Sequence, residues 1–222
     1  MKRFYFDEIQ NKTMPNGRVS LSIALSPSNH SHNLVNQQVT VDNSSHWFPM
    51  RITYHRELRI KAMLDGLGIE NFLPMHYELV ETKTQGKKRI LSPAIHNLIF
   101  VKSTQEYLTN LKMTREEFAP MRYIMKKSYT EDKKSEIMVV PDKQMDNFMR
   151  VASVQDDRVM FLDNNEFVNK VGQRVKVTDG YFAGVEGVIK RINKNKRVVV
   201  QLEGVAAVAI AFVPASQLTL IE

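Results

Sequence analysis

From residue 46 onward, the spacing of apolar side chains predicts alternating strands and helices. Residues 47–52 carry large apolar side chains and indicate a strand. The continuous apolar run at residues 98–101 is typical of a buried central strand. A helix is expected over residues 56–66, because apolar side chains recur there at helical spacing, at Ile60, Met63, Leu64 and Leu67.

Weaker patterns complete this part of the chain. Residues 85–89 indicate a basic turn, and residues 141–151 indicate a second helix. Pro49 cannot donate a ladder hydrogen bond, so it favours an edge or irregular position for the first strand. The order of elements predicts an α+β fold, in which helices pack on an antiparallel sheet. Further short strands are expected at residues 71–80, 121–125 and 137–140.

The two ends of the chain differ from this central part. Residues 1–45 are polar and turn-prone, which predicts a loosely ordered leader with one short strand at residues 19–23. Residues 155–158 and 163–166 are polar and acidic, and they indicate a linker over residues 157–170. Residues 171–222 alternate in several short strands, including a hairpin around residues 193–196, and predict a small all-β barrel.

Composition narrows the possible functions. The 222 residues include 31 basic and 24 acidic side chains, and the net charge of +7 suggests a polyanionic partner. The absence of cysteine excludes disulfides, thiolate zinc sites and cysteine nucleophiles. No apolar run approaches the roughly 18 residues needed to span a bilayer. The N-terminus also lacks the apolar core of a signal peptide, so we expect a cytoplasmic protein that does not associate with membranes.

The sequence contains no recognisable catalytic motif. A phosphate-binding P-loop, a nucleophile elbow and an H-E-x-x-H zinc motif are all absent. The paired acids Glu116-Glu117 and Asp156-Asp157 are interpreted as solvated surface groups. His30 and His32 have no third ligand nearby, so they do not indicate a metal site. We therefore expect neither enzyme activity nor a cofactor or metal.

Residues 171–189 resemble a KOW motif within an SH3-like barrel. Its glycines are expected to provide positive φ angles and tight turns, and its two aromatic side chains to pin the loop by packing. The residues that carry the motif are Gly180, Tyr181, Phe182, Gly184 and Gly187.

Residues 46–156 resemble the N-terminal domain of NusG-type transcription elongation factors. Three segments match in order: the aromatic strand Trp47-Phe48, then residues 72–74, then residues 86–101. Where the family has a proline and a tyrosine, this chain has His96 and Leu98. These departures and the extra leader make the chain similar to the specialised RfaH and UpxY antiterminators of polysaccharide and capsule operons.

The resemblance implies a function based on binding. The N-terminal domain would dock on the clamp helices of the largest RNA polymerase subunit and so suppress pausing and termination, a helix-in-groove interaction. The residue pattern favours a core position for Phe100 and leaves core and surface equally open for Ile95 and Leu98. The matching dock positions are Tyr54, Phe72, Ile95, Leu98 and Phe100.

The family also places the non-template DNA strand near this domain. Cationic side chains beside an aromatic ring such as Tyr54 suit single-stranded nucleic acid, and helical spacing would place His55 and Arg59 on one face. The alternative is a solvated basic surface. The candidate residues are His55, Arg56, Arg59, Lys87, Lys88 and Arg89.

The KOW barrel implies further partners, a ribosomal protein or the termination factor Rho, and a monomer is expected. In RfaH this domain converts from a helical hairpin to a barrel. Here residues 206–211 are rich in alanine, but Val198-Val199-Val200 and the glycines favour strands, so no conversion is predicted. The alternative function is a ribosome-associated RNA-binding protein, since KOW barrels also occur in ribosomal proteins.

Overall fold

The computed structural model describes residues 12–13, 19–20, 44–82, 86–126, 135–155, 157–162 and 172–221. The chain falls into two compact units, residues 1–43 and 44–222. In the first unit, β1 (Lys12–Thr13) pairs antiparallel with β2 (Val19–Ser20), inside the predicted leader. His30 and His32 lie outside the described residues.

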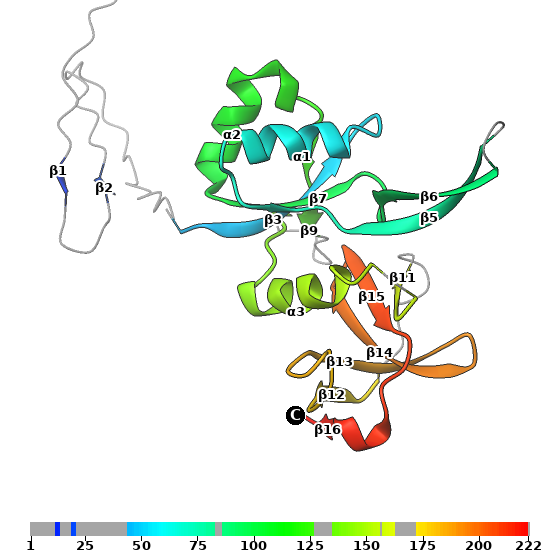
Figure 1. Ribbon diagram of the computed structural model, residues 1–222. Helices are drawn as coiled ribbons and strands as arrows, with labels where there is room; N and C mark the ends of the chain where they lie inside the picture. Colours follow the sequence, from blue (N-terminus) through cyan, green and yellow to red (C-terminus); the bar gives the residue numbers. More distant parts are fainter. Residues whose placement is uncertain are drawn as a thin grey trace, which may run out of the picture. The chain divides into compact units, whose positions relative to one another are not determined.

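Residues 44–155 contain three α-helices and eight strands among their described residues, in the mixed arrangement that was predicted (Figure 1). The helix at residues 105–114 and the strand at residues 86–93 were not predicted, whereas the strand at residues 75–82 lies largely within the one expected at residues 71–80. In chain order the elements are β3 (His46–Ile52), α1 (Glu57–Gly66), β4 (Asn71–Phe72), β5 (Met75–Thr82), β6 (Gly86–Pro93), β7 (Leu98–Ser103), α2 (Gln105–Thr114), a 3-10 turn (Glu116–Phe118), β8 (Met121–Tyr123), β9 (Met125–Lys126), β10 (Glu136–Ile137) and α3 (Asp142–Ala152).

The remaining elements form an all-β part, as predicted, but this part begins earlier than expected. Residues 159–162, within the predicted linker 157–170, form a strand that pairs with β15. The six strands of this part make one antiparallel sheet in the order β11-β15-β14-β13-β12-β16, consistent with a small SH3-like barrel. We call this sheet the barrel. Its elements are β11 (Val159–Leu162), β12 (Arg174–Val177), β13 (Glu186–Ile192), β14 (Asn195–Leu202), β15 (Ala206–Ile210), a 3-10 turn (Ala215–Gln217) and β16 (Leu218–Leu220).

Residues 44–155 are built around a four-stranded antiparallel sheet, in the order β4-β7-β3-β8. Side chains of β7 alternate between its faces: Ile99 and Val101 pack with α1 and α2, whereas Leu98 and Phe100 pack toward α3. All four are at most 4% exposed, so the prediction of a buried central strand is confirmed. Helices therefore cover both faces of the sheet (Figure 1).

Two predictions about the strands of residues 44–155 need correction. Strand β3 is interior, not at an edge, yet Pro49 is accommodated because the pairing with β8 starts only at Met50. Residues 86–89 do not form a turn. They begin β6, which pairs with β5 along its whole length in a hairpin.

One glycine of the barrel motif differs from the prediction. Gly180 and Gly184 adopt positive φ angles of 83° and 88°, as expected for tight turns. Gly187 has no positive φ and lies within β13, where a Cβ would approach the Val199 carbonyl oxygen to 2.8 Å. This glycine permits a close approach of strands, not a turn. Of the two aromatic residues, Phe182 is buried in the core, whereas Tyr181 is 67% exposed.

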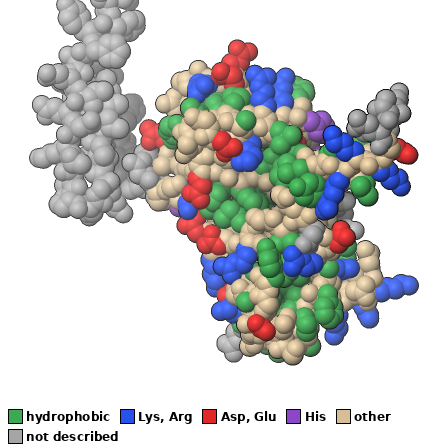
Figure 2. Space-filling model, in the orientation of Figure 1, with side chains coloured by type: hydrophobic (Ala, Val, Ile, Leu, Met, Phe, Trp, Pro, Cys, Tyr) green, Lys and Arg blue, Asp and Glu red, His purple; other side chains and the backbone are tan. Residues whose placement is uncertain are grey.

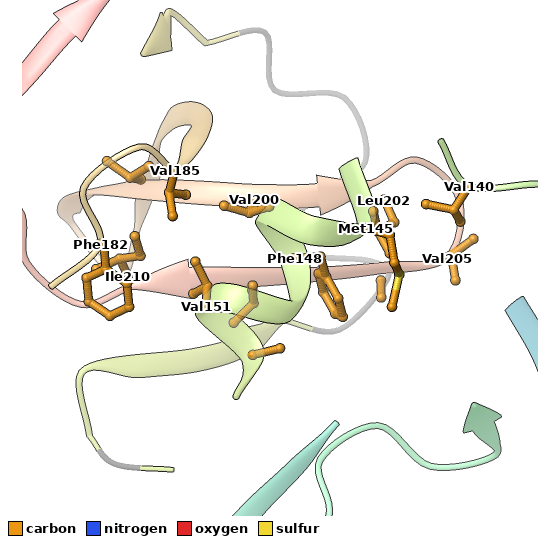
Figure 3. Packing of buried hydrophobic residues seen from close by; sticks show 14 of the residues in the cluster. Val140, Met145, Phe148, Val151, Phe182, Val185, Val200, Leu202, Val205 and Ile210 are labelled. Carbon is orange, nitrogen blue, oxygen red and sulfur yellow. The ribbon is translucent and has the colours of Figure 1, made fainter. Parts of the chain in front are cut away.

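Helix α3 lies between the sheet and the barrel. Its apolar side chains Met145, Phe148 and Val151 are fully buried and share one cluster with barrel residues, as Figure 3 shows for Val200 and Leu202. The sheet, α3 and the barrel thus have a continuous apolar core within the second unit.

Polar contacts also join α3 to the barrel. Lys143 Nζ lies 2.9 Å from Glu186 Oε1, and the Glu186 backbone N–H donates to Asn147 Oδ1 over 3.3 Å. Arg150 Nη1 donates to the Ala183 carbonyl oxygen over 2.9 Å. The hydrogen bond from Lys143 is the main reason why the pKa of the Glu186 carboxyl is lowered.

Candidate functional site

Four of the five predicted dock residues converge on the face of the sheet that α3 covers. Leu98 is 4% exposed and Phe100 is completely buried, while Phe72 and Ile95 pack against the same cluster. The Phe148 ring of α3 lies 5.5 Å from the Phe100 ring, centroid to centroid. In this structure, therefore, the convergent apolar face is an interior and not an open groove.

Tyr54 lies apart from that face, in the turn between β3 and α1. Tyr54 and His55 adopt φ angles of 66° and 50°, although neither is glycine or asparagine. Arg56 is the N-cap of α1, and its guanidinium lies 5.4 Å from the centre of the Tyr54 ring. Because His55 precedes the helix, it does not share a helical face with Arg59, contrary to the prediction.

The turn at residues 53–56 is held against a second turn at residues 94–97. The backbone N–H of Ile52 donates to the Asn97 carbonyl oxygen over 3.0 Å, and that of Asn97 donates to Glu57 Oε1 over 2.5 Å. Asn97 itself has a positive φ of 61°. Glu57 is only 3% exposed, so this carboxylate joins α1 to the start of β7 from inside.

This arrangement brings two histidines together. The imidazoles of His55 and His96 are exposed, and their ring centroids lie 5.9 Å apart in an edge-to-face arrangement. One ligand atom from each of His55, Glu57 and His96 lies within 4.8 Å of the other two. Sequence reasoning missed Glu57 and this grouping, because about forty residues separate His96 from the other two.

The other predicted basic residues lie on the β5–β6 hairpin. Arg89 stacks its guanidinium 4.3 Å from the centre of the Tyr77 ring and donates from Nη2 to the Gln155 carbonyl oxygen over 3.3 Å. Lys87 and Lys88 are exposed and, as neighbours in β6, point to opposite faces of the hairpin. Figure 2 shows Lys and Arg side chains scattered over the visible face, with no single basic stripe.

A cavity of about 350 Å³ lies at the base of this hairpin. His76 and Ser92 lie opposite one another in the hairpin. His76 Nδ1 and Ser92 Oγ are both buried, and neither has a hydrogen-bond partner among the described residues. Arg89 is the one predicted site residue in the cavity wall, whose other members include His76, Tyr77, Val154, Val159 and Phe161.

Comparisons with known proteins point to one family. Residues 45–149 match the family model described as "Transcription termination factor nusG". No curated protein matches the chain. Among solved structures, one described as "Domain interaction in Thermotoga maritima NusG" aligns with 81% of this chain and 98% of its own, at 16% identity and a TM-score of 0.40. None of the helices in the described residues has the length and apolar character needed to cross a membrane.

Proposed function

We propose that this chain, whose residues 45–149 form a NusG-type domain, is a transcription elongation and antitermination factor that acts by binding RNA polymerase. The family match is the observation that carries the proposal, because the NusG family consists of non-enzymatic transcription factors. The matched residues include all three segments that carried the resemblance in the sequence, at residues 47–48, 72–74 and 86–101. As part of the same proposal, we place the protein in the cytoplasm.

The proposed polymerase contact is the apolar face formed by Phe72, Ile95, Leu98 and Phe100, together with Tyr54, which lies apart from this face in the turn before α1. Its partner would be the clamp helices, because an apolar face with aromatic members accepts a helix well. Helix α3 and the barrel cover this face. Binding through these residues therefore requires α3 and the barrel to move away. The apparent affinity for polymerase is then proportional to the fraction of molecules in which the face is uncovered.

The full chain is expected to co-elute with purified RNA polymerase in size-exclusion chromatography and to leave purified ribosomal subunits unbound. Both mixtures are run at the same salt concentration, because a net charge of +7 favours any polyanion at low ionic strength. Association with ribosomal subunits alone would support the second candidate function, an RNA-binding protein of the ribosome.

The non-template DNA strand is the proposed nucleic-acid partner. Tyr54, His55, Arg56 and Arg59 are exposed together where α1 begins, and they offer an aromatic ring beside cationic groups. Lys87 and Lys88 on the hairpin form a second group. Arg89 is the weakest candidate, because its guanidinium already contacts Tyr77 and Gln155.

The double substitution Arg56→Ala/Arg59→Ala is expected to weaken recruitment to an elongation complex with an exposed non-template strand by about ten-fold or more. Each lost cation contact is worth about 1–3 kcal/mol, and the difference from wild type should shrink as salt rises. Recruitment is measured by gel shift of assembled complexes at two salt concentrations, and binding to free polymerase should stay unchanged.

The matched control is Lys194→Ala/Lys196→Ala, which removes the same charge from the exposed β13–β14 turn of the barrel. If it weakens recruitment as much as the arginine variant does, the effect reflects net charge, and the α1 residues are not a specific site.

We further propose which operon type the protein acts on and which partners its barrel recruits. His96 and Leu98, which replace the proline and tyrosine usual in the family, support a specialised antiterminator of a polysaccharide or capsule operon. The barrel motif, Gly180 to Gly187, supports recruitment of a ribosomal protein or Rho. A readthrough assay with purified polymerase on the leader of the neighbouring operon tests the first point.

A further inference from the structure

Glu57 is a buried carboxylate without a cationic partner. It is 3% exposed, and among the described residues its partner is the Asn97 backbone N–H, with no lysine or arginine within ion-pair distance. Buried charges in proteins are normally paired with an opposite charge or coordinate a metal. The buried Glu57 carboxylate therefore has no positive charge beside it to compensate its own.

Two imidazoles stand beside this carboxylate. One ligand atom each from His55, Glu57 and His96 lies within 4.8 Å of the others, and both histidines are exposed at the surface above the buried glutamate. Neither histidine has a hydrogen bond to another described residue, so neither ring is already committed to a protein acceptor.

We propose that His55, Glu57 and His96 bind a divalent transition-metal cation, with Zn²⁺ as the ion of choice. Two imidazole nitrogens and one carboxylate oxygen are an ordinary zinc ligand set, completed by a solvent molecule. Ligand atoms on a tetrahedral zinc lie about 3.4 Å apart, so the imidazoles must close slightly around the ion. Their exposure leaves them room to turn.

The backbone around the site is already arranged for ligation. The Asn97 N–H donates to Glu57 Oε1 and holds the carboxylate in place, as outer hydrogen bonds commonly do for metal ligands. The positive φ angles of His55 and Asn97 keep the two turns facing each other. Local strain of this kind persists where surrounding contacts impose it, and a bound cation adds one more such contact.

Such an ion would join the turn at residues 53–56 to the turn at residues 94–97. It would fix the exposed pair Tyr54 and Arg56 relative to the start of β7 and add positive charge beside them. The inference rests on these contacts alone, and its test needs neither polymerase nor nucleic acid. The proposed function and the metal site can therefore fail independently.

The test is titration of the metal-free full chain with ZnCl2 by isothermal calorimetry, with ¹H–¹⁵N NMR of the histidine rings as second readout. One equivalent is expected to bind, and the His55 and His96 resonances should shift at that point. His55→Gln and His96→Gln should each weaken binding at least about ten-fold. Glu57→Gln should weaken it too, because the amide oxygen still accepts from Asn97 but carries no charge.

The matched control is His30→Gln/His32→Gln, which removes two imidazoles from elsewhere in the same chain. Zinc affinity and stoichiometry equal to those of wild type would support the site at residues 55, 57 and 96. The proposal is overturned if wild type binds no zinc, if the His30/His32 variant loses the one-equivalent binding, or if His55→Gln and His96→Gln retain it. Circular dichroism of each variant checks that the fold is intact.

Discussion

Replacing Leu98 with aspartate is expected to destabilise the unit of residues 44–222 by more than about 4 kcal/mol. Leu98 is 4% exposed and belongs to the apolar cluster under α3, so the new carboxylate would be buried without a cation. A contact residue on an open surface would behave differently, because the same change would weaken polymerase binding and leave folding intact.

Urea denaturation followed by tryptophan fluorescence measures this effect directly. Trp47 is the single tryptophan, is 1% exposed and lies in the same cluster as Leu98. Leu98→Met should cost less than about 1.5 kcal/mol, because it conserves volume and polarity. Leu79→Asp is the matched control for the added charge, since Leu79 is 71% exposed. If Leu98→Asp has wild-type stability but binds polymerase weakly, Leu98 is at the surface in solution.

Replacing Gly187 with valine is expected to destabilise the protein by at least about 3 kcal/mol. A Cβ at this position would lie 2.8 Å from the Val199 carbonyl oxygen and 2.9 Å from a Val198 methyl group. Both neighbours belong to β14, which pairs with β13 and cannot retreat without breaking the ladder. Overpacking against a backbone atom is relieved only by moving the strand.

Gly187→Ala should already show part of this loss, about 1–3 kcal/mol. The contrasting variant is Gly66→Ala at the end of α1, where a Cβ would meet nothing within 4 Å. That substitution should stabilise the protein by up to about 1 kcal/mol, since alanine favours helix more than glycine does. The same urea titration compares all three, and equal effects at positions 66 and 187 would contradict the role given to the β13–β14 approach.

The strongly periodic elements could be predicted from sequence. The run Leu98 to Val101 is buried on both faces, and the helical spacing of Ile60 and Leu64 locates α1. Helix α3 was also predicted, because Met145 and Phe148 recur with the same period. In each case local spacing and tertiary burial agree, so the pattern alone was sufficient.

Other elements were missed for identifiable reasons. Helix α2 has only Leu108 and Leu111 buried, too short an apolar stripe to stand out, although the N-cap Thr104 was a usable signal. In strand β6, three basic residues follow the first residue, Gly86, and are exposed on both faces of a hairpin. Such a strand lacks the alternation of apolar and polar side chains on which recognition of strands depends.

The site was predicted less well than the fold, because tertiary contacts create it. Tyr54 and His55 have positive φ angles, but neither is a glycine or an asparagine, the residues from which such angles are usually predicted. The hydrogen bond between Asn97 and Glu57 joins residues forty positions apart, and no sequence spacing encodes it. That Leu98 and Phe100 are covered depends on α3 and the barrel, which follow more than forty residues later.

The position of α3 also determines how the protein opens. We expect the amide hydrogens in the middle of α3 to exchange mainly when the sheet on one side or the barrel on the other has separated, since both bury its apolar side chains. Because the sheet and the barrel both pack on α3, we expect the three to unfold together as one cooperative unit. The amides of α3 should therefore be among the last to exchange, and any partner that detaches the barrel would accelerate their exchange first.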